Sequence, residues 1–433
     1  MKVLMFGWEF PPNISGGLGT ACYGLTKELS SFNDIDLTFV IPKVYGNEYK
    51  PNMKLVSASE VELSNDKIRK QGVFEKTRLH EFSRYISAYV TPEQYEKALI
   101  DNEKKTSDSI INAPSGKLKF TGKYDSGLFE EIYRYGLVAS EITTKETYDV
   151  IHAHDWLTFH AGIEAKRTSG KPLIAHVHAT EFDRCGENFN RKVYKIEKKG
   201  MEVADKVITV SDFTRNIVIQ KYKISPLKVI TVHNAVESVN RGEIKNLWKM
   251  GTNDKIVTFL GRITSQKGPE YFIEAAYRVL RKMDNVRFVM AGTGDLYEKM
   301  IRYVVKLGIS DKFYFTGFLR GDDVYRMYAM SDLYIMPSVS EPFGISPLES
   351  IHSNVPVIIS KQSGVSEVLG HAIKVDYWDI DAMADAIYGL LNYTALTDFL
   401  KNKSKQEVEN LKWADVAAKV KEIYYNITWL QAS

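Results

Sequence analysis

Short runs rich in β-branched and aromatic residues alternate along this chain with segments of helical periodicity. This alternation is typical of βαβ units, which build a parallel sheet with helices on both faces. The runs form two sets of six, so we predict an α/β protein with two doubly wound, Rossmann-like domains. The expected strands are Lys2–Phe6, Asp36–Ile41, Tyr148–Ala153, Pro172–His176, Lys206–Val210, Val229–Val232, Ile256–Leu260, Val286–Ala291, Lys312–Thr316, Leu333–Met336, Val355–Ile359 and Ala372–Val375.

The domain boundaries follow from composition. We expect a first domain over residues 1–237, with an inserted excursion of helices and loop over 44–130 that is rich in Lys, Glu, Ser and Asn. A polar stretch without a clear period, 238–254, is the expected linker. Residues 255–412 form the second domain, and 413–433 form a closing helix that could cross back to the first.

The charge and the cysteine content limit which partners and which cellular compartment we expect for this protein. A net charge of +3 on 433 residues is too small to indicate nucleic acid as a partner. Two cysteines, Cys22 and Cys185, cannot form a disulfide framework and fit a reducing compartment. No apolar run is long enough for a signal segment or a membrane span, so we expect a cytoplasmic protein without integral membrane contact. Peripheral docking through the basic run Arg191–Lys199 and the oligomeric state stay open.

Two glycines follow the first strand. Gly16 and Gly17 lie between that strand and a helical pattern beginning near Leu18. Paired glycines let backbone N–H groups approach a ligand, and a helix N-terminus favours an anion. We interpret the loop as a phosphate or sugar contact, with a flexible turn as the alternative.

Histidines follow the third and fourth strands. His154 and Asp155 directly follow the third strand, and His178 follows the fourth. Asp155 would suit the N-cap of the following helix, and His178 could be structural. Alternate histidines can bind a metal, but no companion motif supports one here, so none is expected.

Two cations follow the seventh strand. Arg262 and Lys267 stand five residues apart in a tight loop. Arginine offers a fork of donors and lysine a point charge, which together suit a diphosphate. A solvated pair of loop charges is the alternative.

Two carboxylates surround a glycine turn after the strand at Leu333–Met336. The segment from Ser346 to Glu349 fits a capping box with Pro347 at the first helical position, so Glu349 has a structural alternative. Glu341 has no such alternative and is the safer functional candidate.

Together these motifs resemble the retaining glycosyltransferases of the GT-B fold, closest to the group 1 family that includes glycogen and starch synthases. The resemblance covers nearly the whole chain except 44–130, and it implies two Rossmann-like domains that face a deep cleft. It is carried by Gly16-Gly17-Leu18, His152-Ala153-His154-Asp155-Trp156, Val177-His178, Gly261-Arg262 with Gln266-Lys267-Gly268, and Glu341-Pro342-Phe343-Gly344 with Glu349.

The resemblance also implies site roles. Arg262 and Lys267 bind the donor diphosphate, and Glu349 holds the ribose hydroxyls. Gly16 and Gly17 lie near the diphosphate. The donor sugar would contact His178, Glu341 and the segment Phe343, Gly344 and Ile345, while His154 and Asp155 lie on the acceptor side.

The implied reaction is transfer of a hexose, with glucose favoured, from a nucleotide-diphosphate sugar to a carbohydrate acceptor, with α-1,4-glucan leading. Glycogen and starch synthases usually carry a lysine two residues before the paired glycines, where this chain has Ile14. This difference weighs against an ADP-glucose-dependent glucan synthase. ADP- or UDP-glucose is the expected donor, and the sequence does not fix the donor base between ADP, UDP and GDP. Neither a metal nor pyridoxal phosphate is expected. The alternatives are another acceptor, such as a lipid, a surface polysaccharide or a small sugar, and a non-catalytic binding protein.

Overall fold

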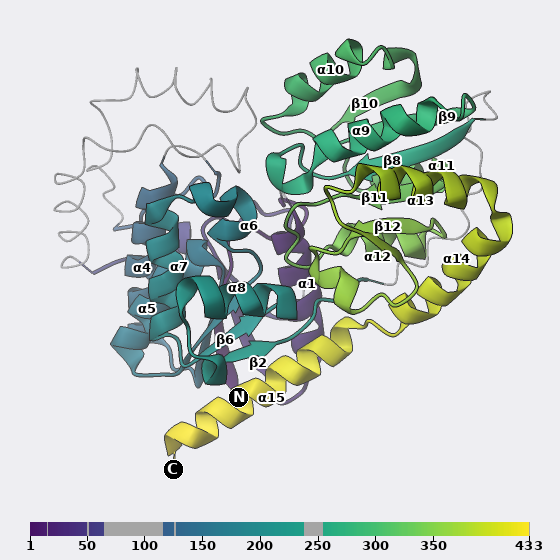
Figure 1. Ribbon diagram of the computed structural model, residues 1–433. Coiled ribbons are helices and arrows are strands. Elements are labelled where there is room, and N and C mark those ends of the chain that lie inside the picture. Colours follow the sequence, from purple (N-terminus) through teal and green to yellow (C-terminus); the bar gives the residue numbers. More distant parts are fainter. Residues whose placement is uncertain (15, 50–51, 65–115, 125–126, 238–253, 433) are drawn as a thin grey trace, which may run out of the picture.

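In the computed structural model the described residues are 1–14, 16–49, 52–64, 116–124, 127–237 and 254–432. They fold into two α/β domains, each built on one sheet (Figure 1). The predicted fold class is therefore confirmed. The predicted linker, apart from its last residue Asp254, and most of the predicted excursion fall outside the described residues.

The first sheet has seven strands in the order β3-β2-β1-β4-β5-β6-β7. Each pair described is parallel, with Val3 opposite Leu37 on one side and Val150 on the other. The strands are β1 (Lys2–Phe6), β2 (Asp36–Ile41), β3 (Lys54–Ser57), β4 (Val150–His154), β5 (Leu173–Val177), β6 (Lys206–Thr209) and β7 (Val229–Thr231).

The second sheet has six parallel strands in the order β10-β9-β8-β11-β12-β13. The twelve predicted strands are present, and their ends differ by at most two residues from those expected. The strands are β8 (Lys255–Leu260), β9 (Val286–Ala291), β10 (Phe313–Gly317), β11 (Leu333–Met336), β12 (Val357–Ser360) and β13 (Ile373–Val375).

Strand β3 lies inside the predicted excursion, so the expectation of helices and loop alone was wrong there. Thr38 pairs with Lys54 and Ile41 with Ser57, which adds an edge strand to the first sheet. This strand has four residues, and the first of them is exposed, so it is too short to show an alternating pattern in the sequence.

Helices cover both faces of the first sheet. One face packs against α4 (Leu128–Lys145), α5 (Trp156–Ser169), α7 (Arg191–Val203) and α8 (Asp212–Tyr222), and the other against α1 (Gly17–Leu29) and α15 (Trp413–Ala432). Because both faces are covered, β4 and β5 are buried along their whole length. A short helix, α6 (Glu181–Cys185), follows β5.

The second sheet is covered in the same way. One face packs against α9 (Pro269–Leu280), α10 (Tyr297–Lys306) and α13 (Ile380–Asn392). The other packs against α11 (Asp322–Met330), α12 (Ile345–His352) and α14 (Thr394–Glu409).

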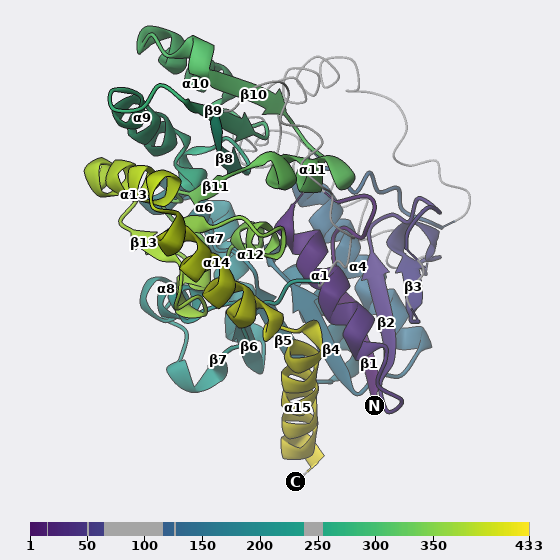
Figure 2. The ribbon, with the colours of Figure 1, turned by 90° about the vertical axis from the view of Figure 1, so that its right-hand side faces the viewer.

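The last helix leaves the second domain and lies along the first. Figure 2 shows α15 beside α1. Val420 and Tyr424 are fully buried in the core that α1 also lines. Lys421 and Tyr425 both bond to Asp34, at 2.6 and 2.9 Å. The helix is therefore part of the first domain's core.

No helix among the described residues has the length and apolar character that a membrane span requires.

Candidate active site

The predicted site residues follow neighbouring strands of the two sheets. In the first, β1 neighbours β4 and β4 neighbours β5, so the loops carrying Gly17, Asp155 and His178 are adjacent. In the second, β8 neighbours β11, and Lys267 and Glu341 follow these two strands. Each set stands where the order of strand addition reverses, which is where open α/β sheets bind ligands.

The glycine loop leaves the N-terminus of α1 open. Gly16 is the N-cap residue, and no side chain caps the first turn. A Cβ atom added at Gly16 or Gly17 would meet nothing within 4 Å, so protein packing does not demand these glycines. The uncapped N–H groups carry partial positive charge, and without a Cβ an anionic group can approach them closely.

His178 is held through its backbone and its side chain. Asp155 Oδ1 accepts hydrogen bonds from the N–H groups of His178 at 2.6 Å and Ala179 at 3.3 Å. His154 Nδ1 lies 2.9 Å from His178 Nε2. Asp155 occupies the N-cap position of α5 without capping it, so the predicted capping alternative was wrong. His154 and Asp155 are both buried, and both hydrogen-bond to His178.

Four imidazoles pack side by side beneath this loop. His152 and His176 join His154 and His178, with stacked or tilted rings 4.3 to 5.2 Å apart between centroids. Tyr424 OH of α15 lies 2.6 Å from His152 Nδ1. Burial lowers the pKa of all four rings, and that of His178 to about 3. At neutral pH His178 is therefore an uncharged hydrogen-bonding group.

Lys267 pairs with Glu341 across the second domain's two loops. Ser338 Oγ also donates to Glu341 Oε2, at 3.2 Å, and Glu341 is only 7% exposed. The sequence offered no structural role for Glu341, but the structure shows an ion pair and a hydrogen bond for it. Arg262 Nη2 donates to Gln266 Oε1 at 3.3 Å, which places the guanidinium in the same loop as Lys267. Lys267 and Glu341 thus form a pair, and Arg262 stands in the same loop as Lys267.

The turn after Glu341 differs from the predicted capping box. Helix α12 begins at Ile345, with Gly344 as its N-cap at φ 102°, a conformation that favours glycine. Pro347 is tolerated in the first turn because N–H groups there have no partner within the helix. Glu349 therefore has no capping role and stands one turn into the helix.

Glu349 lies against the aromatic residues Tyr328 and Tyr334. Burial raises its pKa to about 7, and a hydrogen bond with Tyr328 acts in the opposite direction. Tyr334 OH donates to Ser346 Oγ at 2.8 Å in the same turn. Phe343 is buried, and its carbonyl accepts from Val365 N at 2.7 Å, which fixes the segment before α12.

We expect Glu349→Gln to flatten the pH dependence of stability. Between about pH 4.5 and 7 the folded state keeps a proton on Glu349 that the unfolded state has lost, so the free energy of unfolding falls as pH rises. Asp155 and Glu197 act in the same direction, so part of the slope should remain. Urea unfolding at pH 5, 6, 7 and 8 measures the change, with the exposed Glu422→Gln as control. An unchanged slope for Glu349→Gln would contradict the assignment.

The two domains touch directly beside this group. Ser211 Oγ donates to the carbonyl of Pro342 at 2.5 Å, and Ser340 Oγ donates to Asp183 Oδ1 at 2.6 Å. Glu367 accepts from the first two N–H groups of α8, at 2.9 and 2.7 Å, and lies 2.7 Å from His233 Nε2. The loops after β5 and β11 therefore meet in this structure.

Several site residues were missed by the sequence interpretation. Ser338 contacts Glu341, Ser340 joins the domains, and Tyr328 contacts Glu349. Serine and tyrosine are too common at strand ends to give a signal. Asp183 stood in the same stretch as His178, but its partner is 157 positions away.

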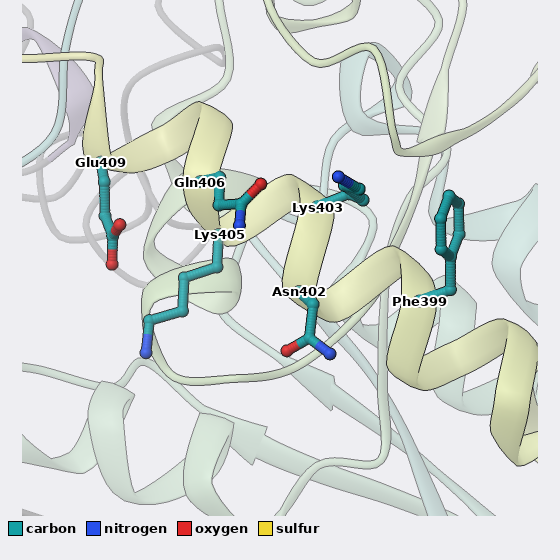
Figure 3. Close-up of a pocket in the computed structure, with 6 residues that line it drawn as sticks. All are labelled: Phe399, Asn402, Lys403, Lys405, Gln406 and Glu409. Carbon is teal, nitrogen blue, oxygen red and sulfur yellow. The ribbon is translucent and has the colours of Figure 1, made fainter.

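A pocket elsewhere on the surface contains none of these residues. Figure 3 shows that its lining side chains come from the single helix α14. The lining residues are Phe399, Asn402, Lys403, Lys405, Gln406 and Glu409.

The expectation of no metal stays a prediction. Among the described residues, Cys22, His154 and His178 place possible ligand atoms within 4.8 Å of one another.

Family models match both halves of the chain. Residues 112–238 match the model described as Glycosyltransferase Family 4, and residues 240–407 match Glycosyl transferases group 1. The chain belongs to the group 1 glycosyltransferases.

Among curated relatives of this transferase, an uncharacterised glycosyltransferase of Methanocaldococcus jannaschii is 26% identical over 98% of both chains. The glycogen synthase of Mycobacterium tuberculosis is 22% identical over 98% of this chain and 94% of its own length. The Anabaena protein HepE, solved with UDP and glucose, matches at a TM-score of 0.66 and 17% identity over 98% of this chain and all of its own. The fold is thus the two-domain, Rossmann-like GT-B fold.

Proposed function

We propose that this group 1 glycosyltransferase moves a hexose, with glucose favoured, from a nucleotide-diphosphate sugar to a glycan with retention of anomeric configuration. The observation that carries the proposal is the pair of Lys267 with Glu341, with Arg262 joined to the same loop through Gln266. This loop touches α6, the helix that follows His178. A relative of this fold holds UDP and glucose, which supports the donor class. Similarity to a glycogen synthase over nearly the whole chain supports α-1,4-glucan as the leading acceptor.

Each residue then has a physical role. The Arg262 fork and the Lys267 ammonium neutralise the charge that develops on the leaving diphosphate, where fixed cations act most strongly. The N-termini of α1 and α12 add partial positive charge. Glu349 accepts from the ribose hydroxyls. Lys267 turns from Glu341 toward the diphosphate when the donor binds, and this frees the carboxylate for the sugar hydroxyls.

The bond changes take place on one face of the sugar. The acceptor oxygen forms its bond to the anomeric carbon on the side from which the diphosphate leaves. The departing phosphate oxygen takes the acceptor proton as the old bond breaks, so the products are the extended glycan and a nucleoside diphosphate. Neutral His178 donates or accepts one hydrogen bond at the sugar, and Asp155 holds it in place.

A donor panel tests the proposal. UDP-, ADP- and GDP-glucose are each incubated with glycogen and with maltooligosaccharides, with and without EDTA, and release of nucleoside diphosphate is measured. We expect turnover with at least one glucose donor, persistence in EDTA, and an α linkage in the product by NMR. A β linkage would exclude retention. Turnover only with other acceptors, such as lipid-linked or small sugars, would replace the glucan assignment.

A further inference from the structure

We propose that Asp183 is a positioning residue that aligns the diphosphate-binding loop of the second domain through Ser340. The inference rests on the proposed function, because it assumes that Arg262 and Lys267 bind the donor. Asp183 does not face the substrate and acts only through other residues. Its carboxylate is 2% exposed and bonds to both domains at once.

One oxygen of Asp183 is held in the first domain. Oδ2 accepts from the backbone N–H and from the hydroxyl of Thr180, both at 2.7 Å, as part of the capping box of α6. The other oxygen, Oδ1, accepts from Ser340 Oγ at 2.6 Å. Because the first oxygen is fixed, the second presents an acceptor of defined position to the second domain.

Helix α6 gives this acceptor a rigid base. Arg184, the next residue, is buried and pairs with Glu181 at 3.0 Å and with Glu197. Tyr222 of α8 donates to Glu197 as well. This buried network resists displacement of α6, because moving it would leave charges unpaired.

In the second domain, Ser340 is hydrogen-bonded to the loop that carries Arg262 and Lys267. The carbonyl of Ser340 accepts from Gln266 Nε2 at 3.0 Å, and Gln266 Oε1 accepts from Arg262 Nη2 at 3.3 Å. Gln266 precedes Lys267, and Ser340 precedes Glu341. A displacement of Ser340 is therefore passed to both cations and to the carboxylate that pairs with Lys267.

This arrangement makes the cation pair complete only when the domains meet. In Figure 1, α6 lies at the side of the first domain that faces the second sheet. Since Asp183 and Ser340 stand on different domains, their hydrogen bond exists only while the two loops meet. This contact would then orient Arg262 and Lys267 for the transition state rather than for binding of the ground state, which affects kcat more than KM.

The test compares Ser340→Ala with Ser340→Thr under saturating donor and acceptor. A hydrogen bond to a charged group of this kind corresponds to a loss of roughly 10-fold to 100-fold in kcat for Ser340→Ala. We expect the donor KM to change less than about 3-fold. Ser340→Thr keeps the hydroxyl and should restore most of kcat. Ser404→Ala, a buried serine on α14 whose hydroxyl bonds within its own helix, should match the wild type.

Two further variants separate positioning from general loosening of the domains. Glu367→Gln weakens another contact between the domains, one made to α8 and His233 and not to Gln266 or Ser340, and should raise the donor KM more than it lowers kcat. The double variant Asp183→Ala/Ser340→Ala should be no slower than Asp183→Ala alone, because both remove one interaction.

Full kcat in Ser340→Ala with an unchanged melting temperature, or additive losses in the double variant, would overturn the role of Asp183. If instead the wild type turns over no nucleotide sugar, the proposed function fails and not the positioning role alone.

Discussion

Replacing either cation, in Arg262→Ala or in Lys267→Ala, should lower kcat by about 100-fold to 1000-fold. Each residue supplies positive charge where the leaving diphosphate develops negative charge, and loss of one such group costs about 2.7–4 kcal/mol in the barrier. Lys267 also balances the charge of the buried Glu341, so its loss leaves a buried carboxylate that keeps the hydrogen bond from Ser338 but loses its cation. Steady-state kinetics with the best donor of the panel measures the effect.

The matched control is Lys299→Ala. Lys299 lies in the same domain, on α10, and its exposed ammonium pairs with Glu270 at 2.9 Å. An exposed ion pair contributes little, so this variant should stay within about twofold of the wild type. Melting temperatures distinguish lost catalysis from lost folding. Normal turnover of Arg262→Ala and Lys267→Ala with every active donor would show that the diphosphate binds elsewhere.

The sheets and the positions of the cations could be predicted because both depend on local sequence. A buried parallel strand is a continuous apolar run, and polar residues that follow it must lie at the edge where the strand ends. Arg262 and His178 were therefore placed correctly at strand ends without knowledge of the fold's details. The family resemblance added the expected ligands, a nucleotide-sugar donor and a carbohydrate acceptor.

What could not be predicted depends on contacts between distant residues or on weak local rules. The bond from Ser340 to Asp183 joins positions 157 apart, and the pair of Lys267 with Glu341 joins positions 74 apart. The start of α12 was misplaced because proline is acceptable throughout a helix's first turn, so Pro347 does not fix the boundary. The capping alternative for Asp155 was wrong because its carboxylate accepts hydrogen bonds from the neighbouring loop and none from its own helix.

The docking of α15 leads to the largest expected effect on stability. Trp413 is 6% exposed within the core shared with α1. Its ring lies flush against Gly24, where an added Cβ would stand 2.3 Å from the ring. We expect Trp413→Ala to lower the free energy of unfolding of the first domain by about 3–5 kcal/mol, because a large buried ring is lost and leaves a cavity.

Trp429 provides the control on the same helix. It is 77% exposed, so Trp429→Ala should change the free energy of unfolding by less than about 0.5 kcal/mol. Gly24→Ala changes the other partner of this contact. Its added methyl group would displace the Trp413 ring, so it should also lower the free energy of unfolding. Urea unfolding, followed by the transition of the first domain, measures all three variants. A loss below about 0.5 kcal/mol for Trp413→Ala as well as for Trp429→Ala would mean that docking of α15 adds little to the stability of the first domain.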